Sequence, residues 1–395
     1  MIKWLAGPPS KPKRSVLITA GPVIGRLDDN KLVSNRSRGL WAMSFARQLT
    51  ELGYFVQLLV PDTLTDVEDM TKADLERRGV LRPRIIRHNG FEDYQEKCRT
   101  LVKVVDVAIM AAAVVNWIPA EPIKGKMPTK GYKPGDRINV PFVLAPRVIE
   151  EMKQINPKMT LIGCKMLSGA PHEDLIEAAY HVVLASKCNA VVANDLSNLR
   201  TKYLVHQDRT VQTFENAFPA LFDALLAIIE DEHYHTVWDQ VDFPVATPGG
   251  FFDQVVDQYR ERFVRRTQDS DCVFGALYEP TGDISLGIVS PREKGQGFSA
   301  KDAVVVEALQ GTTIQVCSSS KATLNAPLLV RVSQKYPGAK AVLHLHEQLP
   351  GYPTVSYAPP GTVRDNDRAI PGPVFNIEGH GFVACLDENG DIFKP

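Results

Sequence analysis

Apolar runs and helical spacing alternate in the first part of the chain. Residues 15–20 form a short apolar run that ends at a Gly-Pro pair, as a buried strand does. Trp41, Phe45 and Leu49 then recur at helical spacing. Residues 55–60 form a second apolar run, which stops before a proline. Strand, helix and strand in this order predict a βαβ unit, with a parallel sheet and helices on its faces.

The alternation continues to about residue 230. Apolar runs predict further strands at 104–110, 160–164 and 191–193, and helical spacing predicts helices at 146–154, 172–186 and 217–230. Residues 1–14 are rich in Pro and Lys, and we interpret them as a lead-in. The pattern therefore predicts a Rossmann-like α/β domain over residues 15–235.

The pattern changes after this domain. Residues 236–254 mix Pro, Gly, Asp and aromatic residues without a period, which indicates a linker. Short strands then dominate, at 272–278, 284–289, 304–307, 313–317, 341–346 and 382–386, with helices at 251–265 and 326–336. Strands in sequence around few helices predict an α+β domain over residues 255–395, with a largely antiparallel sheet.

Composition excludes several functional classes. The 395 residues are 44% hydrophobic and 23% charged, which is typical of soluble globular domains. A net charge of −1 gives no electrostatic case for binding nucleic acid or an anionic membrane. No apolar run reaches the about 18 residues of a membrane span. The six cysteines form no Cys-x-x-Cys pair, so we expect reduced thiols and a cytoplasmic protein.

The loop after the first predicted strand carries the first candidate chemistry. It holds Gly21, Asn35, Arg36 and Ser37 directly before a helix. N–H groups at a helix start, together with an arginine, can bind phosphate oxygens, and ligands of open α/β sheets bind in this crevice. There is no Gly-x-Gly-x-x-Gly or Walker motif, so a polar loop that only caps the helix is the alternative.

Five segments in a fixed order resemble the phosphopantothenoylcysteine synthetase (phosphopantothenate–cysteine ligase) family. The first joins the Ile-Thr-Ala-Gly turn at 18–21 to the Ser-Asn loop at 32–39. The others are Asp106 with Ala-Ala-Ala-Val-Val-Asn-Trp-Ile-Pro at 111–119, and the stretches at 144–149, 163–166 and 192–197. Together they cover about residues 15–230.

The resemblance implies a dimeric ligase of coenzyme A biosynthesis. Such a ligase activates a carboxylate with CTP or ATP and Mg²⁺, and an amine then displaces the nucleotide from the acyl nucleotidylate. The matching positions imply catalytic roles for Asn116, Lys165 and Asn194. They imply nucleotide-binding roles for Gly21, Asn35, Arg36, Ser37, Ala193 and Asp195.

Two departures from the family pattern limit this expectation. Pro22 replaces the second glycine of the turn and removes an N–H from the phosphate-facing loop. Asn116 replaces the aspartate of the family segment. Nucleotide binding is then expected to persist while the acid or the amine substrate differs, and a non-catalytic nucleotide-binding protein is a further alternative.

Three histidines mark the second domain. His344 and His346 stand at i and i+2 of a predicted strand, so both side chains point to one face. His380 lies between two glycines. Three neutral imidazoles can hold a divalent ion and leave one position open, which is the catalytic pattern. A pair of surface histidines on a strand is the alternative.

The context of these histidines resembles the class II aldolase/adducin family. Residues 336–346 match its His-x-His run, and residues 378–385 match the segment of the third histidine. The resemblance implies that His344, His346 and His380 bind Zn²⁺ or another divalent metal that stabilises an enediolate. It implies substrate contacts for Ser319, Ser320 and Asn325.

The position of Asn325 leaves the activity of this domain open. The family has a catalytic glutamate there, and asparagine cannot remove a proton. We therefore consider a bifunctional enzyme, a single-activity ligase with a truncated structural aldolase-like domain, and a non-catalytic nucleotide-binding protein. The expected partners are small-molecule carboxylate and amine substrates and further copies of the chain, as a homo-oligomer, with no nucleic acid and no membrane.

Overall fold

The structure is a computed structural model that describes residues 13–64, 83–216, 218–238, 250–281, 287–318 and 320–393. The chain divides into two compact units. The first unit comprises Met1–Gln207 and Thr213–Leu225, and the second comprises Asp208–Gln212 and Leu226–Pro395. In the described residues, no helix is long and apolar enough to cross a membrane.

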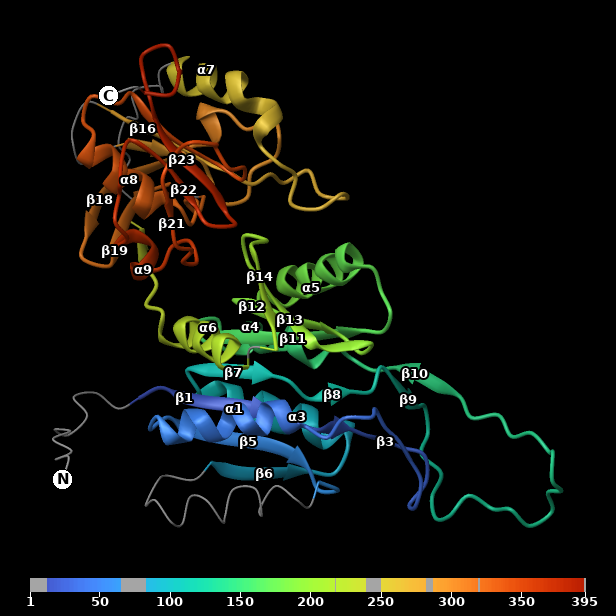
Figure 1. Cartoon of the computed structure of the whole chain (residues 1–395). Coiled ribbons are helices and arrows are strands. Elements are labelled where there is room, and N and C mark those ends of the chain that lie inside the picture. The colour runs from blue at the N-terminus through green and yellow to red at the C-terminus, as the bar shows by residue number, and fades with distance from the viewer. Residues whose placement is uncertain are drawn as a thin grey trace, which may run out of the picture. The chain divides into compact units, whose positions relative to one another are not determined.

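An eight-stranded sheet forms the centre of the first unit, in the order β14-β13-β12-β11-β7-β1-β5-β6 (Figure 1). Its strands are β1 (Ser15–Thr19), β5 (Phe55–Pro61), β6 (Arg84–His88), β7 (Val107–Met110), β11 (Thr160–Leu167), β12 (Ala190–Asp195), β13 (Asn198–His206) and β14 (Val211–Glu215). The six strands from β12 to β6 pair in parallel, and β13 is antiparallel to β12. The predicted Rossmann-like α/β fold is confirmed.

Two groups of helices cover this sheet. Helix α1 (Leu40–Glu51) packs on β1 and β5, and its Phe45 contacts Phe222 of α6 (Phe218–Glu230). The helices α3 (Phe91–Leu101), α4 (Val148–Ile155) and α5 (His172–Ser186) pack in series. The sequence pattern had not indicated α3, because its exposed face carries five charged residues and its apolar stripe is narrow.

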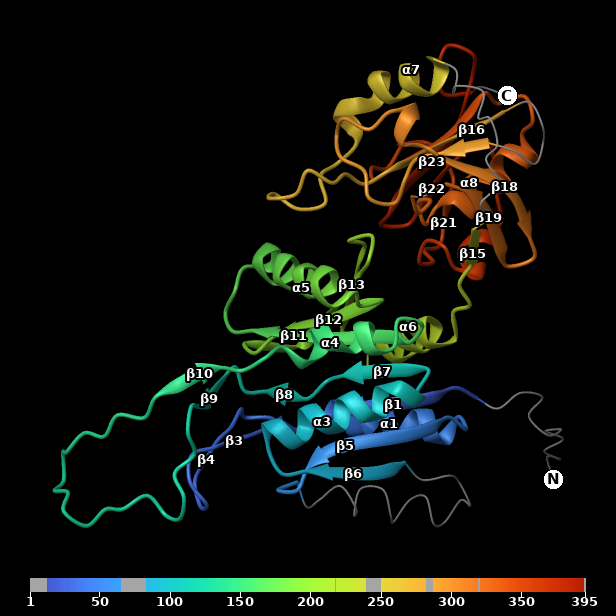
Figure 2. The same ribbon diagram turned by 180° about the vertical axis from the view of Figure 1, so that it is seen from behind.

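Short strands extend the first unit beyond the main sheet. They are β2 (Pro22–Val23) with β8 (Ala113–Val114), β3 (Gly25–Arg26) with β4 (Leu32–Val33), and β9 (Trp117–Pro119) with β10 (Phe142–Leu144). The chain between β9 and β10 runs out as a long open arm (Figure 2). All three residues of β10 are exposed.

The second unit is built on a nine-stranded sheet in the order β15-β19-β18-β17-β16-β20-β23-β22-β21. Its strands are β15 (His235–Trp238), β16 (Ala276–Pro280), β17 (Gly287–Val289), β18 (Val304–Gln310), β19 (Thr313–Cys317), β20 (Ala341–Leu345), β21 (Thr354–Val355), β22 (Val374–Ile377) and β23 (Gly381–Leu386). All pairs are antiparallel except β15 with β19 and β21 with β22. The predicted α+β architecture with a largely antiparallel sheet is confirmed.

Helices lie on both faces of this second sheet. On β20, Val342 belongs to the core under α8 (Ala326–Lys335), and Leu343 belongs to the core under α7 (Gly250–Tyr259). The short helix α9 (Val363–Asn366) and the 3₁₀ turns η2 (Arg260–Arg262) and η3 (Ala300–Asp302) also belong to the second unit, whereas the 3₁₀ turn η1 (Val102–Val104) follows α3 in the first unit. The helix predicted over 251–265 was too long, because a 3₁₀ turn replaces the α-helix after Tyr259.

The predicted linker begins inside a strand. β15, His235–Trp238, pairs in parallel with β19, so at least the first residues of the 236–254 segment belong to the second sheet. A four-residue edge strand carries too little alternation to be recognised in a sequence. Residues 239–249 of the linker and 1–12 of the lead-in lie outside the described residues, so the predicted boundaries at 14, 235 and 254 stay predictions.

Candidate nucleotide crevice and candidate metal centre

The strand order of the first unit creates a crevice between β1 and β7. From β1 the chain continues to β5 and β6 on one side of the sheet, whereas β7, β11 and β12 lie on the other side. The segments that follow β1 and β7 therefore leave the sheet in opposite directions at the carboxyl ends of these two strands. Ala113, after β7, donates its N–H to the carbonyl of Gly21, after β1, at 2.9 Å. Ala112 donates to Thr19 Oγ1 at 3.1 Å. These bonds fix the two chain segments at the mouth of the crevice.

Two glycines allow the backbone to pack tightly at this crevice. Gly21 has φ +79° and Gly39, directly before α1, has φ +64°. A Cβ at Gly39 would lie 2.7 Å from the backbone nitrogen of Gly21, closer than van der Waals contact allows. The loop before α1 therefore rests backbone against backbone on the turn after β1, which only glycine permits.

Asn35 connects the loop before α1 to the segment after β7. Its Nδ2 donates to the carbonyls of Ala113 at 3.2 Å and Val114 at 2.9 Å. Asn116, next along that segment, is exposed, and its own carbonyl accepts from Ala145 at 2.8 Å. The structure therefore brings Gly21, Asn35 and the Asn116 segment together. Arg36 is exposed in the same loop, and Ser37 Oγ accepts from the Gly39 N–H at 3.4 Å.

The second group of predicted residues lies two strands away along the same edge. Lys165 of β11 is in register with Ala193 of β12, and Asn194 follows at the carboxyl end. Asn194 Oδ1 accepts from Lys202 Nζ at 3.2 Å. Burial lowers the pKa of Lys202. Lys202 was not identified in the sequence, because its strand, β13, shows no clear alternation.

Asp195 has a structural role at the end of β12. Its carboxylate accepts from Ser197 and from the N–H groups of Gly169 and Ala170, both at 3.0 Å. These hydrogen bonds, that from Ser197 first, hold the pKa of Asp195 well below its usual range. The charged carboxylate therefore holds the turn after β11, and the predicted nucleotide contact of Asp195 stays a prediction.

The three histidines of the second unit meet at one point. His344 on β20 is fully buried, His346 directly after β20 is half-buried, and His380 directly before β23 is 4% exposed. One nitrogen from each ring lies within 4.8 Å of one from each other ring. The i, i+2 spacing on β20 and the β20–β23 pairing produce this arrangement. The predicted cluster of three imidazoles is confirmed, and its metal stays a prediction.

The protonation states of two rings suit a metal ion. His344 Nδ1 lies 2.8 Å from the carbonyl oxygen of Phe382, which can only accept, so Nδ1 carries the hydrogen and Nε2 has a free lone pair. Among the described residues, Nε2 of His344 and Nε2 of His380 are buried and have no hydrogen-bond partner. Buried lone pairs that converge without a donor fit a divalent ion bound by neutral imidazoles.

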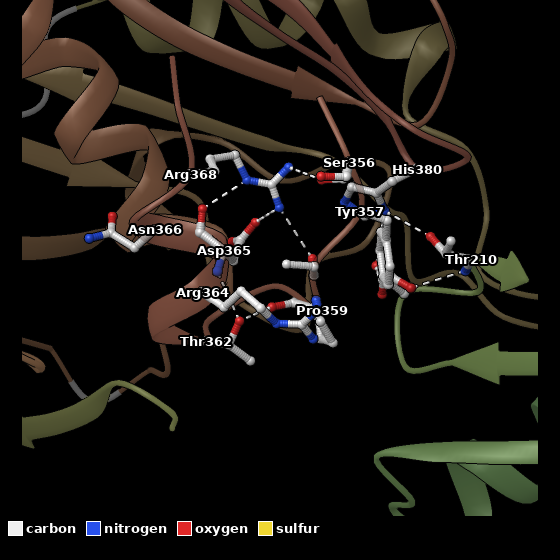
Figure 3. Close-up of polar contacts among 12 residues, drawn as sticks. Thr210, Ser356, Tyr357, Pro359, Thr362, Arg364, Asp365, Asn366, Arg368 and His380 are labelled. Atoms are coloured by element: carbon white, nitrogen blue, oxygen red, sulfur yellow. Dashed lines mark hydrogen bonds and ion pairs between the residues drawn. The ribbon is translucent and has the colours of Figure 1, made fainter. Parts of the chain in front are cut away.

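A carboxylate orients the third ring (Figure 3). His380 Nδ1 lies 2.9 Å from Asp208 Oδ2 and 3.1 Å from Thr210 Oγ1. Tyr357 donates its hydroxyl to the same Asp208 oxygen at 2.9 Å. A histidine whose Nδ1–H donates to a carboxylate presents Nε2 to the metal, which is the usual arrangement around ligand histidines. These three residues of the second unit were missed in the sequence, because Asp208 and Thr210 lie far from the histidine motifs.

The environment of His344 and His346 favours the neutral form of both rings. Burial, and after it the charge of His380, lowers the pKa of both His344 and His346 well below the usual value for histidine. Neutral imidazole is the form that binds a metal.

A cavity of about 500 Å³ lies beside Tyr357. It is lined by Val355, Ser356, Tyr357, Ala358, Arg364, Asp367, Arg368 and Ala369. Both arginines already have carboxylate partners: Arg364 contacts both oxygens of Asp231 at 2.9 Å, and Arg368 forms an ion pair with Asp365. The cavity therefore has polar walls without an uncompensated cation.

The predicted substrate contacts are only partly placed. Ser319 lies outside the described residues. Ser320 is exposed, and its N–H donates to Ser318 Oγ at 3.1 Å. Asn325 is 8% exposed and precedes α8, where its carbonyl accepts from Leu329. Among the described residues, no hydrogen bond joins the Asn325 side chain to the triad, so these contacts stay predictions.

Known proteins resemble parts of the chain to different degrees. The coenzyme A biosynthesis bifunctional protein CoaBC of Thermococcus kodakarensis is 27% identical over 189 residues, which is 48% of this chain and 43% of that protein. The chain thus spans less than half the length of this curated relative. The alignment with the solved DNA/pantothenate metabolism flavoprotein of Streptococcus pneumoniae covers 55% of this chain and 98% of that protein's chain, with 18% identity and a TM-score of 0.44. The alignment with the solved L-fuculose 1-phosphate aldolase covers 36% of this chain and 78% of that protein's chain, with 14% identity and a TM-score of 0.28.

The match to a family is decisive for the first unit. The sequence model of the DNA/pantothenate metabolism flavoprotein C-terminal domain matches residues 12–217, more than half of the chain. This range contains the whole crevice between β1 and β7 and the strand ends of β11 and β12. The chain therefore belongs to the family of the DNA/pantothenate metabolism flavoprotein C-terminal domain, which includes phosphopantothenoylcysteine synthetase.

Proposed function

We propose that the first unit is a nucleotide-dependent acid–amine ligase of the phosphopantothenoylcysteine synthetase type, acting in coenzyme A biosynthesis. The observation that carries this proposal is the crevice outside β1 and β7. There Gly21 and Gly39 let the loop before α1 pack backbone against backbone on the turn after β1, and Asn35 fixes this loop. The similarity to a bifunctional enzyme of coenzyme A biosynthesis supports the same assignment.

The proposed reaction has two steps. The substrate carboxylate attacks the α-phosphorus of CTP or ATP, held with Mg²⁺, and pyrophosphate leaves. The amine then attacks the acyl carbon, loses a proton, and releases the nucleoside monophosphate. Gly21, Arg36, Ser37, Ala193 and Asp195 are the proposed nucleotide contacts. Asn116, Lys165 and Asn194 are the proposed donors of hydrogen bonds to the acyl phosphate, where negative charge develops.

The substrates of this ligase are proposed by class. Phosphopantothenate and cysteine are the first pair to test, because the family resemblance implies them. Pro22 and Asn116 depart from the family pattern at the crevice, which favours a different acid or amine over a loss of nucleotide binding. A non-catalytic nucleotide-binding protein is the alternative, and it predicts nucleotide binding without pyrophosphate release.

We propose that the second unit, which resembles class II aldolases in sequence, binds one Zn²⁺ or similar divalent ion through His344, His346 and His380. The buried Nε2 lone pairs of His344 and His380 carry this proposal. A bound divalent ion supplies Lewis-acid stabilisation of negative charge on a substrate oxygen. The unit then acts on a small carbonyl or hydroxy compound related to the ligase substrate.

Asn325 stands where the resembled family has a catalytic glutamate. A purely structural role of the second unit is therefore the alternative to a second enzymatic activity. Glu347, next to the triad in sequence, forms an ion pair with Arg262 and is therefore a poor candidate for the missing base. If the role is structural, we expect the protein to bind the metal but to convert no carbonyl substrate.

We further propose a cytoplasmic homo-oligomer. The exposed apolar side chains of Trp117, Val143 and Leu144 on β9 and β10 support self-association, since these are 57%, 46% and 65% exposed. Light scattering on the wild type and on Leu144→Asp tests it: a dimer or larger species should become smaller in the variant. A mass of one chain for the wild type at all concentrations contradicts it.

The ligase is tested by pyrophosphate release. Wild-type protein with Mg²⁺, phosphopantothenate and cysteine should release pyrophosphate with CTP or ATP and form the amide, detected by mass spectrometry. Asn35→Ala should reduce the rate by at least tenfold, because the loop before α1 loses its anchor to β8. Failure of both nucleotides to bind in calorimetry contradicts the proposal.

A further inference from the structure

Asn194 of the first unit has a cationic partner that the family resemblance does not indicate. Its Oδ1 accepts a hydrogen bond from Nζ of Lys202, on the neighbouring strand β13, at 3.2 Å. The ammonium group of a lysine can only donate, so this contact determines which end of the Asn194 amide is the oxygen. The amide nitrogen, Nδ2, then faces away from Lys202 and carries both donors of the side chain.

Lys202 has no carboxylate to compensate its charge. Among the described residues, Asn194 is its hydrogen-bond partner, and no carboxylate forms an ion pair with it. The residue is half-buried, and burial lowers the pKa of its ammonium group. Taking a charge partly out of water without an opposite charge costs free energy. Stabilisation of the fold therefore does not explain a lysine at this position.

The order of the strands places the helices of the first unit on two faces of its sheet. The chain moves from β1 to β5 through α1, and from β6 to β7 through α3 in the opposite direction along the sheet. The crossovers through α4 and α5 continue in this second direction. Because parallel crossovers are right-handed, α1 lies on one face and α3, α4 and α5 lie on the other (Figures 1 and 2).

Asn194 points to the face of α1. On the neighbouring strand β11, Gly163 faces α4, since a Cβ built there would lie 3.0 Å from Cδ1 of Ile149. Lys165, two residues further along β11, faces the same way. Asn194 is in register with Met166, the residue after Lys165, and therefore points to the opposite face.

Lys202 shares the face of Asn194, as the hydrogen bond between the two side chains requires. Its neighbour Tyr203 points the other way, where its ring centroid lies 4.7 Å from that of His172 at the start of α5. The lysine that meets Asn194 is therefore Lys202 of β13 and not Lys165 of β11. The pair lies on the same face as α1, and the loop before α1 belongs to the proposed nucleotide site.

We propose that Lys202 is a positioning residue of the ligase, whose ammonium group holds the Asn194 amide so that Nδ2 donates to the acyl phosphate. The proposal rests on the proposed function of the first unit and adds a residue to its machinery. Among the described residues Nδ2 has no partner, and it is not buried, so a ligand can reach it. Turning the amide end for end would present Oδ1 to the phosphate oxygens, which repel it, and the bond from Lys202 prevents this turn.

Pyrophosphate release by variants of the full chain tests this role. Lys202→Met should lower kcat by about tenfold or more, the effect of one lost hydrogen bond to a charged group, and Lys202→Arg, which also only donates, should restore most of it. Lys158→Met removes an exposed lysine of the same unit and should leave kcat unchanged. Because Lys202→Met removes a half-buried charge, its Tm should not fall below that of the wild type, so a low rate is not a folding defect.

A double-mutant cycle separates positioning from a direct effect of the lysine charge. If Lys202 acts through Asn194, Lys202→Met should have no further effect on kcat in the Asn194→Ala protein. Independent losses that multiply in the double variant overturn the positioning role. A Lys202→Met enzyme as fast as the wild type overturns it as well.

The side-chain amide of Asn194 gives a readout that does not depend on ligase activity. In protein with isotope-labelled asparagine, its NMR signal is assigned by its loss in Asn194→Ala. The signal should shift in Lys202→Met and stay in place in Lys158→Met. An unchanged signal in Lys202→Met overturns the proposal whether or not the protein is a ligase. A shifted signal in a protein that releases no pyrophosphate supports the hold of Lys202 on Asn194 and contradicts the ligase function alone.

Discussion

Asp208 Oδ2 lies 2.9 Å from Nδ1 of His380, on the side of the ring opposite to the nitrogen that faces the other two histidines. Thr210 shares the same Nδ1 at 3.1 Å, and Tyr357 donates to the same carboxylate oxygen. The ring is therefore held by a buried polar network and not by apolar packing alone. Such a network fixes both the orientation of His380 and the position of its proton.

Asp208→Asn should weaken zinc binding by about 10-fold to 100-fold, because partners of ligand histidines typically contribute this much. The amide keeps the shape of the carboxylate but loses its charge. Competition with a chromophoric chelator measures the affinity. Asp257→Asn, which changes an exposed carboxylate of the same unit, should leave it unchanged. Equal affinities of Asp208→Asn and the wild type would show that the carboxylate has no role in the metal centre.

His346→Ala should lose most of the bound metal while the first unit stays folded. The half-buried ring contributes one of the three converging nitrogens, and the triad belongs to the second of the two compact units. Elemental analysis of protein purified without chelator gives the content. His181→Ala removes an exposed imidazole of α5 and serves as the control. A zinc content below one per chain in the wild type that soaking does not raise speaks against the site.

Gly39→Ala should weaken nucleotide binding by more than its loss of folding stability can explain. The new Cβ would meet the Gly21 nitrogen at 2.7 Å, so the loop must move away from β1. Gly131→Ala also places alanine at a positive φ, of +97°, but meets no atom within 4 Å. Both variants carry the backbone strain of about 1 kcal/mol, and only the first displaces the loop. Calorimetric titration with CTP and ATP compares them, and equal affinities would exclude the loop from the nucleotide site.

The first unit should lose stability as the pH falls from about 6.5 to 4. His88 is 1% exposed, and burial lowers its pKa to about 4. Between these pH values the unfolded chain binds a proton at His88 that the native state does not, so the free energy of unfolding rises with pH. His88→Phe removes this contribution, which amounts to roughly 3 kcal/mol, and keeps the edge contact with Tyr94.

Urea unfolding of the wild type and His88→Phe at pH 7.5, 6, 5 and 4 measures this difference. The two proteins share all other titrating groups, so their difference in unfolding free energy isolates His88. A difference that stays constant over this range would mean that His88 has the same pKa in the native and the unfolded state.

Arg368→Met should destabilise the second unit by about 3 kcal/mol, because it leaves Asp365 buried and unpaired. Burial already raises the pKa of Asp365 to about 6, although Arg368 opposes this shift. The double variant Arg368→Met with Asp365→Leu should recover most of the loss, since it removes both charges. Arg265→Met at an exposed position is the control. A single variant as stable as the wild type would refute the pairing.

The periodic elements of the fold could be predicted from the sequence. The helix at 172–186 and the strand at 313–317 were predicted with their observed bounds, because their apolar residues repeat at one clear period. The strands β13 and β15 were not predicted. β13 is exposed at one end and buried at the other, so its buried and exposed residues do not alternate. β15 has only four residues and lies at the edge of its sheet. Their pairing depends on partners that no local pattern indicates.

The candidate sites show the same limit. The His344–His346 pair could be predicted, since residues at i and i+2 of any strand share a face. Asp208 could not, because it meets His380 only through chain segments distant in sequence. Lys202 could not either, although its partner Asn194 is only eight residues away. Their residue types are common on protein surfaces, and only burial distinguishes them.

Burial in the two units also determines how the thiols react. It raises the pKa of Cys98, Cys188 and Cys385 to about 12, so at neutral pH these three carry almost no thiolate, the reactive form. Cys272 and Cys317 are instead only partly buried. A thiol-directed spectroscopic label should therefore react first in the second unit, at Cys272 and Cys317.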